Sequence, residues 1–166
     1  ANTIPTDDLM TNMRVNKLLY FAQGECLRKL GKPLFDDDME AWDYGPVVPP
    51  VYQTYKGFGR EPIKDGVDYQ DTFSEQEKNV LFDVLRYYGQ FSTSALVSLS
   101  HEAQSPWAAA HKNGDKHATI SKESIKAFFE SKPPIPEFTI PYQENHFAGY
   151  RDKYGYLVLP KEWDDE

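Results

Sequence analysis

The residues best suited to metal or covalent chemistry in this sequence are its four histidines and its one cysteine. His101-Glu102 begins like a helical zinc motif, but Ser105 stands four positions after His101, where the second ligand on that helical face is required. Cys26 with one of the other histidines as its base is the second route to an enzyme. Because Cys26 falls on the apolar stripe of a predicted helix, we interpret it as a buried structural thiol. We therefore predict no catalytic, metal-binding or cofactor-binding residues and no enzyme activity.

A run of carboxylates begins at Asp36 and continues through Asp37 and Asp38 to Glu40. Alternating carboxylates are typical of calcium loops, but this run lacks the glycine and the distal bidentate glutamate that such a loop requires. We interpret it as a solvated acidic turn, so it predicts no bound cation.

The formal net charge of −8 is concentrated in one quarter of the chain. Residues 36–77 hold eleven acidic and three basic residues, whereas the rest of the chain holds fifteen of each. A protein that binds nucleic acid through its phosphates normally shows the opposite balance or a basic stripe, so we expect no nucleic-acid partner. An acidic face favours association with a basic protein partner instead. A solvated surface that keeps the protein soluble is the competing interpretation.

Four aromatic residues gather around the turn signal Gly45-Pro46, next to the acidic run. Abundant aromatic side chains beside an excess of charge are typical of the hot spots of protein interfaces, while packing in the core is the alternative. We predict a partner-binding surface formed by Asp36, Asp37, Asp38, Trp42, Tyr44, Tyr52 and Tyr55.

Apolar spacing and end signals predict six helices. The first runs from about Asn12 to Leu30 and is stopped by Gly31. The third is bounded by a capping box that starts at Ser74 and by Gly89. Its apolar stripe is predicted to consist of Val80, Leu81, Val84, Leu85 and Tyr88. The other helices are predicted to begin after Pro46, near Ser92, at Ser105 and at Ser121.

Two segments between these helices predict other structure. Residues Met39–Tyr44 predict a short strand that a turn at Gly45-Pro46 ends, and the unpatterned residues Phe58–Thr72 predict a loop. After the sixth helix, three prolines force an extended exit, and the tail that follows is rich in aromatic residues. We expect this tail to pack on the domain or on a partner, because it is too apolar for a free linker.

The expected fold class is mainly α: a compact bundle of about six helices with a short strand or hairpin near Trp42 and an extended C-terminal tail. Residues 1–131 are predicted to form the helical domain, and residues 132–166 the proline-rich exit and the tail. The 166 residues, 40% of them hydrophobic, are enough for one core. A single cysteine excludes a disulfide scaffold. No apolar run approaches the ~20 residues of a membrane span, so we expect a soluble, cytoplasmic protein without a membrane partner.

Three separated segments, Arg14–Gly24, Glu40–Tyr52 and Leu99–Trp107, resemble in order and spacing the Panacea domain family, also called SocA-like or GepA-like. The resemblance spans about residues 12–131. Members are mainly helical domains that serve as antitoxins in toxin–antitoxin pairs, often in phages and mobile elements. They usually have a helix before the Lys-Leu-Leu-Tyr-Phe-Ala-Gln motif, whereas only about a dozen residues precede the matching segment here.

This resemblance implies an antitoxin that neutralises a cognate protein toxin, encoded by the adjacent gene, by direct binding and without a cofactor. In that mechanism the acidic, aromatic surface covers a basic toxin site that otherwise engages RNA or nucleotide phosphates. Two alternatives stay open: an adaptor that delivers the toxin to a protease, and a metal- or cysteine-dependent enzyme that uses His101, Glu102 or Cys26. Homo-oligomerisation is also left open.

Overall fold

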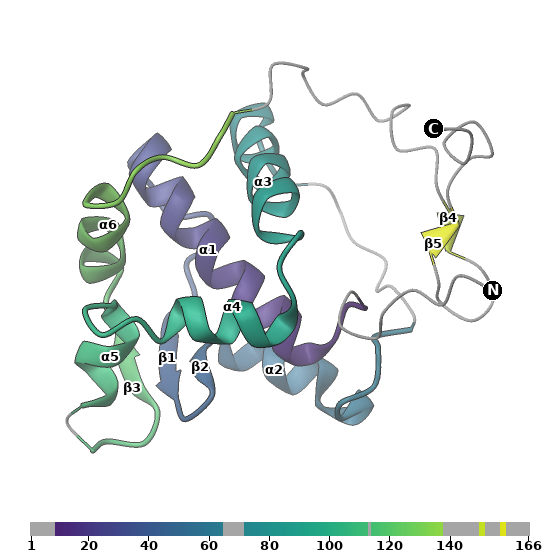
Figure 1. Ribbon diagram of the computed structural model, residues 1–166, viewed down its shortest axis with the longest axis horizontal. Coiled ribbons are helices and arrows are strands. Elements are labelled where there is room, and N and C mark those ends of the chain that lie inside the picture. The colour runs from purple at the N-terminus through teal and green to yellow at the C-terminus, as the bar shows by residue number, and fades with distance from the viewer. Residues whose placement is uncertain (1–8, 65–71, 113, 138–149, 152–156, 159–166) are drawn as a thin grey trace.

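The protein is described by a computed structural model, which covers residues 9–64, 72–112, 114–137, 150–151 and 157–158 (Figure 1). Its helices are α1 (Asn12–Leu30), α2 (Pro49–Tyr55), α3 (Glu75–Tyr88), α4 (Thr93–Ser100), α5 (Pro106–His111) and α6 (Lys122–Glu130), with a short 3-10 helix, η2 (Lys56–Phe58). Its strands are β1 (Met39–Trp42), β2 (Gly45–Val47), β3 (Ala118–Ile120), β4 (Tyr150–Arg151) and β5 (Leu157–Val158). The mainly α class predicted from the sequence is confirmed.

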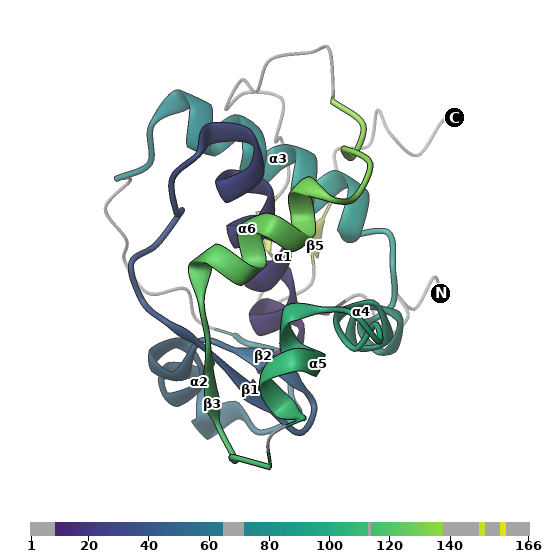
Figure 2. The ribbon, with the colours of Figure 1, turned by 90° about the vertical axis from the view of Figure 1, so that its left-hand side faces the viewer.

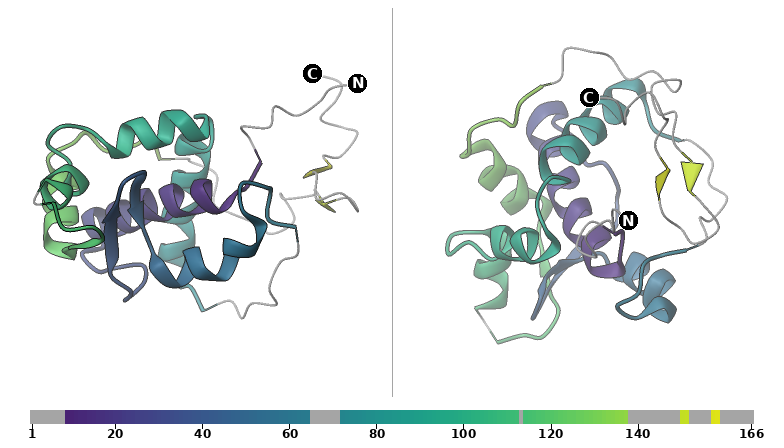
Figure 3. Two further views of the ribbon diagram at one scale, coloured as in Figure 1. Left: turned by 90° about the horizontal axis from the view of Figure 1, so that it is seen from below. Right: turned by 45° about the vertical axis from the view of Figure 1, so that its right-hand side comes forward.

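The long helix α1 lies at the centre of the molecule, and its predicted bounds are confirmed. Thr11 caps its first turn, and Gly31 ends it in the left-handed region at φ 73°, which glycine adopts without strain. The helix packs against α3, α4, α6, α2 and β2, so it is buried on nearly every side (Figures 1 and 3). A Cβ at Gly24 would overlap the ring of Phe129 on α6, which explains a glycine in the middle of this helix.

Strands β2, β1 and β3 form an antiparallel sheet in that order. The predicted turn at Gly45-Pro46 is wrong: Asp43 and Tyr44 form the turn of the β1–β2 hairpin, and Gly45-Pro46 belongs to β2. Proline is tolerated there because β2 is an edge strand of this sheet, where no neighbour needs its missing N–H. Strand β3 was not predicted from the sequence, because its three residues have no pattern of their own and pair with the distant β1.

Helix α3 confirms its predicted capping box, in which the Ser74 hydroxyl accepts from the Glu77 amide while the Glu77 carboxylate accepts from the Ser74 amide. Its predicted apolar stripe is partly wrong. Val80, Val84 and Tyr88 are buried, but Leu85 is 44% exposed. The helix turns by about 100° per residue, so Leu85 lies well away from the line through Val80 and Val84.

The smaller helices follow their predicted caps. The hydroxyls of Ser92, Ser105 and Ser121 each accept a backbone N–H in the first turn of α4, α5 and α6. The sheet, α2 and α5 lie at one end of the molecule and α3 lies toward the other, with α1 between them (Figure 2). The residues after α6 lead over α1 to Glu137, and most of the aromatic tail predicted to pack on the domain lies outside the described residues. In the part of the chain that the structure covers, no helix has the length and apolarity of a membrane span.

Candidate functional site

The tip of the β1–β2 hairpin displays the most exposed large hydrophobic side chain recorded in the described residues. Tyr44, in the turn, is 70% exposed. Trp42, at the end of β1, is half-buried, and its ring meets Tyr52 of α2 edge to face at 4.7 Å between centroids. The structure therefore brings together Trp42 and Tyr52 as predicted. Tyr55, one helical turn beyond Tyr52, is also half-buried.

Two histidines, His111 and His117, also belong to this region, although no sequence pattern linked them to it. His117 stacks on Trp42 at 4.1 Å between ring centroids, with 15° between the planes. The His111 Nε2 lies 3.0 Å from the Asp43 carboxylate in the hairpin turn, and this hydrogen bond is the main cause that lowers the pKa of Asp43. We define the hairpin face as Trp42, Asp43, Tyr44, Tyr52, His111 and His117.

Trp107 supports the hairpin face from beneath. Its indole N–H donates to the Trp42 carbonyl at 2.7 Å, and its ring lies between His101, at 3.9 Å, and His111, at 4.6 Å, in two stacked contacts. Burial lowers the pKa of His101, and the nearby Lys17 ammonium lowers it further, while a hydrogen bond to the Tyr44 backbone acts in the opposite direction. His101 is thus a packed, largely neutral ring against the tryptophan.

The hairpin is fastened to α1 by two buried polar side chains. The Asn16 carboxamide oxygen accepts from the Val48 amide at 2.9 Å, and the Lys17 ammonium donates to the Pro46 carbonyl at 3.1 Å. Burial lowers the pKa of Lys17 to about 8. Gly45 lies so close that a Cβ there would come within 2.7 Å of the Lys17 side chain. These contacts fix the position from which Tyr44 projects.

The acidic run lies apart from the hairpin face. Asp36, Asp37 and Asp38 are exposed and precede β1, whereas the hairpin turn follows it, so the length of the strand, about 13 Å for four residues, separates them. Lys122 of α6 donates to the Asp36 carbonyl and pairs with the Asp38 carboxylate at 3.0 Å. The residues predicted to form one surface therefore form two patches, at opposite ends of β1.

The residues singled out for enzyme chemistry are poorly arranged for it. Cys26 is fully buried, and burial raises the pKa of its thiol to about 12, so its nucleophilic thiolate is scarce at neutral pH. Glu102 forms an ion pair with Lys132 at 3.0 Å. Among the described residues, no three histidine, cysteine or carboxylate side chains are grouped to hold a metal ion. What the described part does expose is the aromatic side chain of Tyr44 in the hairpin face.

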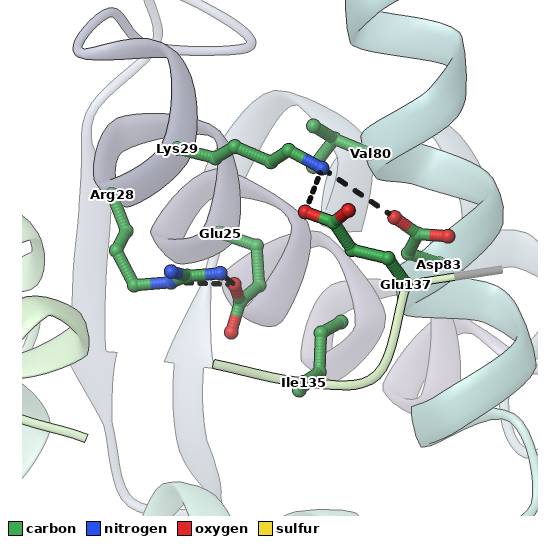
Figure 4. A pocket seen from close by; sticks show the side chains of 7 residues that line it. All are labelled: Glu25, Arg28, Lys29, Val80, Asp83, Ile135 and Glu137. Carbon is green, nitrogen blue, oxygen red and sulfur yellow. Dashed lines mark hydrogen bonds and ion pairs between the residues drawn. The ribbon is translucent and has the colours of Figure 1, made fainter. Parts of the chain in front are cut away.

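A small recess between α1 and α3 has room for about one water molecule (Figure 4). In it the Lys29 ammonium bridges Glu137, at 2.8 Å, and Asp83 of α3, at 3.9 Å, while Arg28 pairs with Glu25 at 2.7 Å. Burial raises the pKa of Glu25, although Arg28 lowers it. The recess is too small for an organic ligand and serves to join the two helices to the segment that follows α6.

Comparisons with known proteins place this chain in a family. A family model described as "Antitoxin SocA-like, Panacea domain" matches residues 15–108, which is more than half of the chain. The chain is 33% identical over 109 residues to a protein named Antitoxin SocA from Caulobacter vibrioides (strain NA1000 / CB15N). The match covers 59% of this chain and 58% of that relative, so the chain matches less than two thirds of its length. No solved structure matches the chain.

Proposed function

The chain belongs to the SocA-like Panacea domain family of antitoxins, and on this basis we propose that it neutralises a cognate protein toxin by binding it directly. The observation that carries the proposal is the family match, which runs from α1 through the first turn of α5 and includes both strands of the hairpin.

The hairpin face is the proposed contact surface. Tyr44 projects from a supported base, because the ring of Trp42 contacts both Tyr52 and His117 and its carbonyl accepts from Trp107. A large aromatic side chain on a preorganised support is what an interface anchor requires, since little conformational entropy is lost when it is covered. Half-buried neighbours around such an anchor exclude water from the contact.

The proposed mechanism is stoichiometric occlusion of a basic site on the toxin. The eight excess negative charges fall between residues 36 and 77, the part of the chain that holds β1, β2 and α2. Opposite charge on the toxin then accelerates encounter, while the aromatic anchor slows dissociation. A toxin site that binds RNA or nucleotide phosphates is basic, so the negative charge of this part of the chain attracts it toward the hairpin face.

The experiment that tests this function uses the product of the adjacent gene as the toxin. We expect the two full-length proteins to co-purify and this protein to restore growth of cells that express the toxin, with the amount of toxin unchanged. Failure to bind the toxin and to protect the cells contradicts the antitoxin function. Protection together with loss of the toxin itself indicates delivery to a protease instead of occlusion.

The contact surface is tested separately with Tyr44→Ala. We expect the Kd for the toxin to rise about 30-fold or more, equivalent to about 2 kcal/mol, mainly through faster dissociation, with an unchanged melting temperature. Leu85→Ala is the matched control, because it removes an exposed hydrophobic side chain from α3. Equal affinities of Tyr44→Ala and wild type would place the contact elsewhere, while leaving the antitoxin function intact.

A further inference from the structure

Three aromatic rings are stacked beneath the β1–β2 hairpin. The Trp107 ring of α5 stacks on two histidine rings, with centroid distances of 3.9 Å to His101 and 4.6 Å to His111. His101 ends α4, and His111 is the last residue of α5. We define these three residues as the ring stack. Because flat rings in contact restrict each other's rotation, each ring is held in one orientation.

Two rings of the stack bind successive residues at the tip of the hairpin. The Trp107 indole N–H donates to the Trp42 carbonyl at 2.7 Å. The His111 Nε2 lies 3.0 Å from the carboxylate of Asp43, the next residue along the chain, and donates to it, because an ionised carboxylate only accepts. Hydrogen bonds weaken steeply when the donor turns away, so both bonds depend on the orientation that the stack gives each ring.

The third ring binds the third residue of the tip. His101 forms a hydrogen bond to the Tyr44 backbone, which acts to raise the pKa of the ring. A bond that favours the protonated imidazole is donated by it, so the Tyr44 carbonyl accepts. The His101 Nε2 is buried without a hydrogen-bond partner among the described residues, so Nδ1 is the donor. Trp42, Asp43 and Tyr44, which lead from β1 into the turn, are thus each bound by one ring.

The backbone of the turn is also closely packed against other elements. Helix α5 packs against β1 and β3 and lies beside the hairpin (Figure 2). A Cβ at Gly45 would come within 2.7 Å of the Lys17 side chain and 3.0 Å of the Ser100 hydroxyl. Because the turn is bonded to the ring stack and meets side chains of α1 and α4, little space remains for another conformation of its backbone.

We propose that His101, Trp107 and His111 are positioning residues, which hold the hairpin turn in the conformation that presents Tyr44 to the toxin. This inference rests on the proposed function and names the residues that keep its contact surface ready to bind. A loop that is fixed before binding loses little conformational entropy on association. A turn that spends part of its time in other conformations binds less tightly in proportion. His101 and Trp107, which lie beneath the hairpin face, act only through Tyr44.

Backbone ¹⁵N relaxation of the full-length protein tests the ring stack without the toxin. Trp107→Phe, His101→Phe and His111→Phe each keep an aromatic ring in the stack and remove one bond to the turn. We expect the order parameters of residues 43–45 to fall in each variant below the value of about 0.85 that is typical of rigid backbone. The His111 side chain is 36% exposed, so this variant folds even where a buried substitution does not. Tyr87→Phe, on α3, is the control and leaves the order parameters of the turn unchanged.

Double-mutant cycles with the product of the adjacent gene test the positioning role. We expect Trp107→Phe and His101→Phe each to raise the Kd for the toxin about three- to tenfold in the otherwise native protein. Combined with Tyr44→Ala, each should raise the Kd by less than about twofold, because both residues act through Tyr44. Tyr87→Phe should leave the Kd unchanged in both backgrounds.

Two results overturn the positioning role while the proposed function stands. One is unchanged order parameters of the turn in all three ring-stack variants, with toxin binding by the wild type intact. The other is an equal loss of affinity with and without the Tyr44 side chain, which shows that His101 and Trp107 act independently of it. Failure of the wild type to bind the toxin, with order parameters that fall as expected, contradicts the proposed function instead, and with it the positioning role.

Discussion

Helix α1 and the hairpin face both lie largely within the segment that matches the family model, but their polar side chains differ in burial and in the groups they contact. On α1, the buried groups of Arg14, Asn16 and Gln23 are bonded to the backbone of distant loops. In the hairpin face, Tyr44 is exposed, and His111 and His117 contact their neighbours at the surface.

This difference separates residues that hold the fold from residues available to a partner. A buried polar group must find its hydrogen-bond partner, so each bond on α1 specifies the path of a loop. The Arg14 guanidinium donates to the carbonyls of both Gly89 and Phe91, and so fixes the turn between α3 and α4. A sequence motif that includes these residues therefore reports the fold, and the partner must be sought where side chains remain exposed.

The largest effect that tests this comparison is expected for Gln23→Leu. Gln23 is fully buried, accepts from the Leu34 amide at 2.8 Å and donates to the Phe35 carbonyl at 2.9 Å. Leucine leaves these backbone groups unpaired, so unfolding free energy should fall by about 3 kcal/mol, measured by urea denaturation. The toxin affinity of the folded protein should not change.

Gln53→Leu is the matched control, because Gln53 is exposed on α2 and its replacement should change stability by less than about 0.5 kcal/mol. Similar losses of unfolding free energy in Gln23→Leu and Gln53→Leu would show that the burial of a glutamine does not determine its contribution to stability.

A smaller, pH-dependent effect is expected for Lys17→Met, which removes the buried ammonium beneath the hairpin. The pKa of Lys17 is about 8 in the folded protein, against an ordinary value of 10.5 for a lysine in water. Between pH 8 and pH 10.5 the Lys17 side chain is protonated in the unfolded chain but largely neutral in the folded protein. The unfolding free energy of the wild type therefore rises relative to that of the variant as the pH rises, by about 1 kcal/mol per pH unit. Below about pH 8 the difference between the two should be constant.

Urea denaturation of both proteins between pH 7 and pH 10 measures this difference, and the opposing effect of the Cys26 thiol cancels because both proteins retain it. Lys116→Met, at an exposed position, is the control and should show no such slope. A flat difference for Lys17→Met would mean that water reaches its ammonium.

The smallest effect is expected when Asp36, Asp37 and Asp38 are replaced together by Asn. These exposed side chains lie away from the hairpin face, so we expect association with the toxin to slow by less than about tenfold and to depend less on salt, with an unchanged dissociation rate. Stopped-flow mixing at several salt concentrations measures both rates.

Lys122→Gln is the control, because it removes the ion pair between Lys122 and Asp38 but keeps the three acidic residues. It shows how far the loss of this ion pair alone changes the stability of the fold. The exposed pair itself is worth at most about 1 kcal/mol. A faster dissociation of the triple variant would place the acidic run inside the contact.

The sequence by itself determined the local features of this protein. The bounds of α1, the capping box of α3 and the serine caps of the later helices depend on residues within one or two turns of each other, so their pattern is visible along the chain. The same holds for the mainly α class. The resemblance of three separated segments, in α1, the hairpin and the α4–α5 region, predicted the family from the sequence, and the family model confirms it.

Only the tertiary structure decided which of those residues are exposed and which meet. Leu85 and Tyr44 were assigned from local pattern, but their exposure depends on which face of α3 meets α1 and where the hairpin turns. His117 reaches Trp42, and Trp107 reaches the Trp42 carbonyl 65 residues away, because β3 and α5 pack against β1. These contacts depend on how distant helices and strands pack around one core, and such packing leaves no periodic pattern in the sequence.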